Sequence, residues 1–162
     1  MKKFIITGLS VMLLVGCGVT KEKNVKKETQ KEQTVYAQQE NKYSFPEGVT
    51  PIGEGKMKVV TPDGTSENGN VPVVFIKKDT IIQQVEIELA NFQADKEIFV
   101  YVDKQFEEKH QASELTQTTI ALKKETLQPG VHTVTVIQFE NNDPNGKVIN
   151  FAEAKFKNKP AQ

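Results

Sequence analysis

Two stretches decide the fold of this 162-residue chain: VHTVTVIQF at residues 131–139 and VINFAEAKF at residues 148–156. Both alternate between apolar and polar side chains, which is the pattern of a β-strand with one buried face. Between them, residues 141–146 read NNDPNG, and this composition is typical of a loop that joins two antiparallel strands. Together they predict a β-hairpin near the C-terminal end of the chain.

The same pattern with a period of two recurs further upstream and predicts five more strands. These are Met57–Thr61, Val71–Lys77, Ile81–Leu89, Ile98–Asp103 and Thr118–Lys123. Seven short strands separated by turn residues predict an all-β fold. Its expected form is an antiparallel, immunoglobulin-like β-sandwich of about seven strands.

The pattern also predicts where individual elements lie in the sandwich. Residues 98–103, IFVYVD, are apolar on both faces, which indicates a central strand. The first run at Met57 and the last run at Phe156 are expected at the sheet edges. Residues 103–115, DKQFEEKHQASEL, are helix-like. We expect one or two helical turns there, with Asp103 as the cap and Phe106 packed inward.

A ten-residue segment supports the same fold. Residues 127–136 read LQPGVHTVTV. This segment resembles the start of the penultimate strand in many bacterial immunoglobulin-like and fibronectin-like surface domains. In those domains a tyrosine forms a corner whose hydroxyl bonds back to the backbone. His132 occupies the tyrosine position here, and the resemblance concerns the fold alone.

The N-terminal residues have the features of a secretory signal peptide. Lys2 and Lys3 precede an apolar run at residues 4–15, which is 12 residues long. A helix needs about 20 residues to cross a bilayer core, so the run is too short to span it. It ends in Leu14-Val15-Gly16-Cys17, which resembles the lipobox of bacterial lipoproteins.

The lipobox resemblance implies cleavage between Gly16 and Cys17. It also implies a diacylglycerol thioether on the sulfur of Cys17, with acyl chains of the palmitate type. Two acyl chains hold a protein on a membrane stably. The expected location is therefore the extracytoplasmic face of the cell membrane, with a lipid anchor on Cys17.

The chain is expected to have three parts. Residues 1–16 form the signal peptide, residues 17–45 the lipidated cysteine and a flexible tether, and residues 46–162 the immunoglobulin-like domain. The tether begins with GVTKEKNVKKETQKEQ at residues 18–33, which contains five lysines, three glutamates and no aromatic residue. Such a segment cannot bury enough apolar surface to offset the entropy of ordering, so we expect it to be disordered.

Composition excludes several classes of function. The 21 basic residues are all lysine and are balanced by 21 acidic residues, giving a formal net charge of zero. A nucleic-acid binder that relies on a basic face is therefore not expected. A single cysteine cannot form a disulfide within the chain, and two histidines are too few for a zinc site built from Cys and His. We predict no metal and no cofactor.

The titratable residues do not form a catalytic pattern. His132 shares a strand face with Val134 and Val136, which favours a structural role. His110 and Glu107 could supply two metal ligands, where zinc takes three or four. The pairs Asp103 with Glu107 and Glu86 with Glu88 suit the exposed surface of a sandwich, and no nucleophile motif is present. We predict no catalytic residue and no enzymatic activity.

Two other groups of residues are assigned structural roles. The loop Asp143-Pro144-Asn145-Gly146 lacks the spacing of a calcium loop and is expected to form a turn. Tyr36, Tyr43, Phe45 and Phe92 could stack on carbohydrate, but packing in the core or in the segment that leads into the domain is the favoured interpretation.

The predicted function is that of a membrane-anchored accessory module that binds an unidentified protein partner at the bacterial cell surface. Strand addition at an exposed sheet edge is the expected route. One alternative is a lipoprotein that carries a ligand or metal for a membrane transporter. Another is a lipoprotein associated with conjugation or with prophage exclusion, on the analogy of architecture alone.

Overall fold

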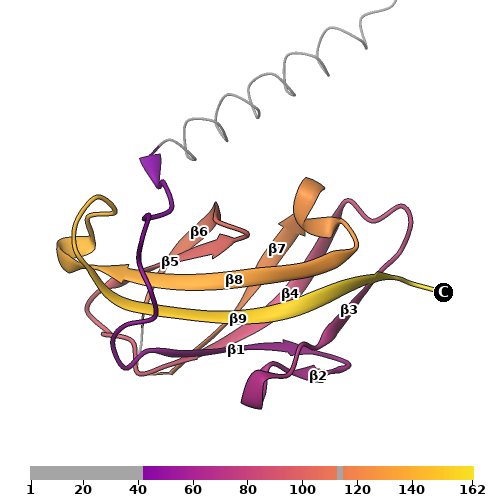
Figure 1. Ribbon diagram of the computed structural model, residues 1–162, viewed down its shortest axis with the longest axis horizontal. Helices are drawn as coiled ribbons and strands as arrows, with labels where there is room; N and C mark the ends of the chain where they lie inside the picture. The colour runs from indigo at the N-terminus through magenta and orange to yellow at the C-terminus, as the bar shows by residue number, and fades with distance from the viewer. Residues whose placement is uncertain (1–41, 113–114) are drawn as a thin grey trace, which may run out of the picture. The chain divides into compact units, whose positions relative to one another are not determined.

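The computed structural model describes residues 42–112 and 115–162, which form two β-sheets (Figure 1). One sheet has the strand order β2-β1-β4-β7, and the other has the order β3-β9-β8-β5-β6. The strands of the first sheet are β1 (Lys56–Thr61), β2 (Gly64–Thr65), β4 (Ile82–Ala90) and β7 (Leu115–Lys123). Those of the second are β3 (Val73–Ile76), β5 (Glu97–Val102), β6 (Gln105–Gln111), β8 (Gly130–Phe139) and β9 (Val148–Pro160).

The prediction of an all-β, immunoglobulin-like sandwich is confirmed. Among the described residues from Lys56 onward, three 3-10 turns are the only helical elements: η1 (Glu67–Gly69), η2 (Lys124–Leu127) and η3 (Glu140–Asn142). Neighbouring strands are antiparallel except for β3, which pairs in parallel with β9. The first strands of the chain are thus divided between the two sheets, with β1 beside β4 and β3 beside β9.

The hairpin that the sequence predicts most strongly is the longest pairing in the fold. Strands β8 and β9 pair from Gly130–Asn158 to Phe139–Val148, with an irregularity at Gln138/Phe139. In the connecting loop, the Asp143 side chain accepts a hydrogen bond from the Asn145 N–H at 3.0 Å, and its carbonyl accepts one from the Gly146 N–H at 2.8 Å. The loop is therefore the predicted turn.

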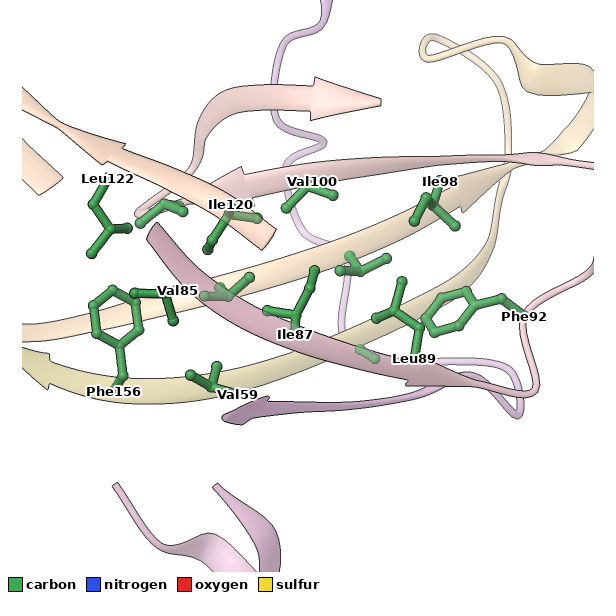
Figure 2. Close-up of a cluster of buried hydrophobic side chains, with 14 of the residues drawn as sticks. Val59, Val85, Ile87, Leu89, Phe92, Ile98, Val100, Ile120, Leu122 and Phe156 are labelled. Atoms are coloured by element: carbon green, nitrogen blue, oxygen red, sulfur yellow. The ribbon is translucent and has the colours of Figure 1, made fainter. Parts of the chain in front are cut away.

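The main core lies between the two sheets. Figure 2 shows apolar side chains from both sheets pointing toward one another. Alternation places them there, because every second residue of β4, β5, β7 and β8 faces the same side. The core residues include Val59, Val85, Ile87, Leu89, Phe92, Ile98, Val100, Val102, Ile120, Leu122, Val134, Val136 and Phe156.

A second apolar cluster covers the outer face of the five-stranded sheet. It consists of Phe99, Tyr101, Ile137, Phe139 and Phe151, all nearly inaccessible to solvent. Strand β5 is consequently buried on both faces, and the prediction that it is central is confirmed, since it lies between β8 and β6.

The segment at residues 42–55, which precedes β1, covers this second cluster, and we call it the lead-in. Tyr43 lies 4.5 Å from Phe106 between ring centroids, and Phe45 lies 5.2 Å from Tyr101 in an edge-on arrangement. Ile52 then pairs with Phe151 in an isolated antiparallel bridge. The predicted domain boundary at residue 46 thus leaves out two aromatic residues that pack on the sheet.

The expectation of helical turns at residues 103–115 is wrong. Asp103 and Lys104 have φ angles of 49° and 69°, and they form a two-residue turn of the kind that joins tight β-hairpins. The residues that follow form β6, which pairs with β5. The sequence pattern did not indicate this strand because the strand lies at a sheet edge and has no apolar alternation. Pairing with β5 overrode the local preference for helical turns. Phe106 packs on the outer cluster with Tyr101 and Tyr43.

The expected sheet edges are also corrected. The run that contains Phe156 belongs to β9, which lies between β3 and β8. The run at Met57 belongs to β1, which lies between β2 and β4, although β2 pairs only with its last two residues. The strands at the ends of the two sheets are β2, β7, β3 and β6. Position in the chain did not indicate position in the sheet.

Candidate functional site

Buried His132 lies at the start of β8 and bonds to two segments that are distant in the sequence. Its Nε2 lies 2.8 Å from the carbonyl oxygen of Gln128, four residues upstream. Its Nδ1 lies 2.6 Å from Asp103 Oδ2, in the turn between β5 and β6. Its ring stacks on Phe156, with 5.3 Å between centroids. Both ring nitrogens lie within hydrogen-bond distance of oxygen atoms, one in each of two distant segments.

Asp103 completes this arrangement with its other atoms. Its Oδ1 accepts a hydrogen bond from the Thr133 N–H at 2.9 Å, and its own N–H donates to the Thr133 carbonyl at 2.9 Å. The imidazole therefore makes the backward bond that the resemblance assigns to a tyrosine hydroxyl, and it makes a second bond to another hairpin. All its polar atoms are used in holding the fold, which agrees with the predicted structural role.

The remaining titratable residues named in the sequence contact different partners, although Glu86 and Glu88 share one face of β4. His110 contacts Glu108 at 3.1 Å, whereas Glu107 lies 3.8 Å from Lys123. Glu88 pairs with Lys58 at 2.9 Å. Glu86 accepts a hydrogen bond from the Gln117 side-chain amide. Asp103 and Glu107 do not form a pair, since Asp103 bonds to His132 and Thr133. No two carboxylates are brought together across a cleft by these contacts.

Several sequence predictions concern residues that the structure does not describe. Gly16 and Cys17, the cleavage and lipidation residues, lie outside the described residues, as does Tyr36. In the part of the chain that is described, no helix has the length and hydropathy needed to cross a membrane. In the same part, no three His, Cys, Asp or Glu residues form a group that could hold a metal ion. Phe92 is buried in the core, as the favoured interpretation expects.

The sheet edges are the candidate interaction surfaces, because an edge strand presents backbone N–H and C=O groups to solvent. Three of the four edge strands have protective features. Strand β2 has two residues, and β3 has four residues that follow Pro72. Strand β6 has the sequence QFEEKHQ, with charged residues along it, and an irregularity in its pairing between Val100 and Tyr101. Short length, proline, charge and bulges all oppose the addition of another strand.

Strand β7 is the exception among these edges. It is nine residues long, with the sequence LTQTTIALK, and its one charged residue is Lys123 at the end. It pairs with β4 in unbroken register from Leu115–Ala90 to Lys123–Ile82. Within residues 42–112 and 115–162, no other strand pairs with its opposite edge. Threonine and isoleucine also favour extended backbone. This edge was missed at the sequence level because sheet order is a tertiary property.

Comparison with known proteins finds that this chain is similar to solved structures of a CARDB domain. No protein-family model and no curated protein matches the chain. The chain is similar to the solution NMR structure of the CARDB domain of the PF1109 protein from Pyrococcus furiosus. The identity is 15%, the match covers 67% of this chain and 97% of that chain, and the TM-score is 0.40. A crystal structure of the same domain in complex with di-metal ions gives 14% identity, 71% and 98% coverage, and a TM-score of 0.39.

Proposed function

We propose that this chain is a bacterial lipoprotein, anchored at the extracytoplasmic face of the cell membrane, whose sandwich domain is a non-catalytic module that binds a protein partner. The lipobox Leu14-Val15-Gly16-Cys17 supports the anchor. The long edge strand β7 supports the binding role, and it is the single observation that carries this part of the proposal.

The physical route is strand addition to β7. An extended segment of the partner would pair with the backbone of β7, and the resulting main-chain hydrogen bonds would supply affinity. The alternating side chains on the outer surface of this sheet, such as Gln117 and Thr119, would supply selectivity. The core would be unaffected, because Ile120 and Leu122 face inward.

The test is to crosslink the full-length tagged protein in cells and to identify captured proteins by mass spectrometry. Three versions of the chain are compared. The first is the parent and the second carries Thr119→Lys, which adds a charge to the exposed face of β7. The third, Gln84→Lys, adds the same charge to an exposed position of the interior strand β4. We expect a discrete partner to be captured by the parent and by Gln84→Lys, and to be lost from Thr119→Lys.

The result that would contradict strand addition is equal capture of the partner by all three chains. Circular dichroism of the purified proteins serves as the folding control, since both substitutions are on exposed side chains and should leave the strand content unchanged.

A further inference from the structure

A hollow of about 770 Å³ lies at one end of the sandwich. Its walls come from three segments: the connection between β3 and β4, the turn η2 with the residues that follow it, and the end of β9. Its lining includes Lys77, Lys78, Ile81, Lys124, Leu127 and Lys159. Its volume lies in the range of ligand-binding pockets.

The walls of the hollow are held by hydrogen bonds from buried groups. Asn158 is 1% exposed, and its side-chain N–H groups donate to the carbonyl oxygens of Thr126 at 2.8 Å and Gln128 at 3.2 Å. The Ala161 N–H donates to the Ile76 carbonyl at 2.8 Å, which fixes the end of β9 to β3. The hollow is therefore formed before any ligand binds, which lowers the entropic cost of binding.

The charges that line the hollow have one sign. It contains four lysines and no carboxylate. In the described part of the chain, Lys77, Lys78 and Lys159 have no carboxylate within ion-pair distance. By contrast, Lys96, Lys109 and Lys123 each have one, and Lys58 has two. A second pocket, lined partly by the lead-in, differs in charge, because Glu47 and Glu153 line it together with Lys104.

The hollow also has an apolar component that extends to its rim. Ile76, Leu127 and the prolines contribute to its walls, and Ile81 on the rim is 81% exposed. An exposed isoleucine beside unpaired lysines matches a ligand that carries both apolar and negatively charged groups.

The hollow and the lead-in are joined by strand β9. Strand β9 begins beside the lead-in, where Phe151 pairs with Ile52, and ends at the hollow with Lys159. Eight residues of strand separate these points, or about 25 Å. Figure 1 shows the lead-in at one end of the domain, and η2 and the C-terminal end of β9 at the other. The hollow therefore opens at the end of the domain opposite the lead-in.

We infer that this hollow binds an acidic segment of a protein partner that also carries an apolar side chain. The carboxylates of the segment pair with Lys77, Lys78 and Lys159, and its apolar side chain packs on Ile81 and Leu127. A concave surface fits a peptide better than a flat bilayer. This site is distinct from the β7 edge, and its test does not depend on strand addition there.

The experiment measures fluorescence anisotropy of a labelled peptide with the full-length protein in neutral phosphatidylcholine nanodiscs. The probe is a short peptide of glutamate and glycine with one central leucine. Two further probes replace its glutamates by lysine or its leucine by serine. The test variant is Lys77→Glu with Lys78→Glu, and the matched control is Lys147→Glu with Lys155→Glu, which changes the net charge equally on exposed lysines outside the hollow.

We expect the acidic leucine peptide to bind the parent, with an affinity that decreases as salt is added. The test variant should weaken binding about tenfold, since each reversed lysine replaces an attraction by a repulsion, and the control should not. Ile81→Ser and the serine peptide should each weaken binding about threefold or more.

Two results would overturn the inference. One is equal binding of the acidic peptide by the test variant and the control. The other is sedimentation of the Cys17→Ala chain with phosphatidylglycerol vesicles, abolished by the test variant, while no acidic peptide binds the parent. That outcome would show that the lysines of the hollow bind an anionic lipid surface and not a peptide.

Discussion

At the scale of single residues, the domain depends on a few buried polar side chains whose partners come from distant segments. His132 joins the turn before β6, the loop before β8 and the core at Phe156. Its side chain is 8% exposed, while the Asp103 carboxylate is 39% exposed. The imidazole therefore bears the larger desolvation, and its removal leaves both a cavity and unpaired acceptors.

Replacement of this imidazole should be among the most destabilising single changes. We expect His132→Ala to lower the free energy of unfolding by about 2–4 kcal/mol, from lost stacking and two lost hydrogen bonds. The matched control is His110→Ala at a half-exposed side chain, which should cost less than about 1 kcal/mol. Urea unfolding measures both. Similar losses in the two variants would contradict the role assigned to His132.

Tyr101 supplies a prediction about pH. Its hydroxyl is buried without a hydrogen-bond partner among the described residues, and burial raises the pKa of Tyr101 to about 12. The unfolded chain ionises near the ordinary value of 10, so the folded state binds the proton more tightly. Ionisation of Tyr101 therefore has no effect on the free energy of unfolding below about pH 10. As the pH rises from about 10 toward 12, the folded state loses stability relative to the unfolded state.

The variant Tyr101→Phe should remove that pH dependence. At neutral pH we expect its stability to equal or exceed that of the parent by about 0.5–1 kcal/mol, because an unpaired buried hydroxyl is removed. As the pH rises above about 10, the parent should lose stability relative to the variant. Urea unfolding over a pH series measures the difference, and a constant difference across the series would contradict the assignment.

At the scale of elements, the lead-in determines how much of the five-stranded sheet is buried. Its aromatic residues cover the outer cluster, and its later part passes close to β9. A Cβ atom at Gly53 would lie 2.0 Å from Asn150 Oδ1, and Gly53 has a φ of +84°. The same Asn150 oxygen accepts a hydrogen bond from the Gly55 N–H at 3.1 Å. Close approach of the backbone, in a left-handed conformation, requires glycine at this position.

Two alanine substitutions separate the steric effect from the conformational one. Gly48 also has a positive φ, +69°, but a Cβ there would meet no atom within 4 Å. We expect Gly48→Ala to cost about 1 kcal/mol and Gly53→Ala about 2 kcal/mol or more. Urea unfolding gives the energies, and increased binding of an apolar dye by Gly53→Ala would report exposure of the outer cluster. Equal costs would show that the lead-in does not need the close approach.

Elements were predictable to different degrees, for identifiable reasons. Strands β8 and β9 have strong alternation and a turn between them, so both were predicted within a few residues. Strand β6 has glutamates, a lysine and a histidine in place of apolar residues. It exists because β5 offers it a backbone to pair with, which no local pattern reports.

At the scale of the whole molecule, the lipobox makes a prediction about location. We expect Cys17→Ala to release the protein from the membrane fraction and to abolish incorporation of a palmitate analogue, because Cys17 is the one cysteine of the chain and the thioether needs its sulfur. Cell fractionation and metabolic labelling measure the two effects. The control is Ser44→Ala, an exposed substitution beyond the lipobox that should leave both unchanged. Normal membrane retention of Cys17→Ala would contradict the anchor.

The sequence by itself determined that this domain is a β-sandwich, because alternation with a period of two and the intervening turns are local properties. It also favoured a structural role for His132, since its neighbours on the strand face are valines. Only the tertiary structure decided which strands lie at the edges, where Asp103 meets His132, and that four lysines from three segments line one hollow. These features depend on pairings between residues far apart in the chain, and local composition does not encode which segments will meet.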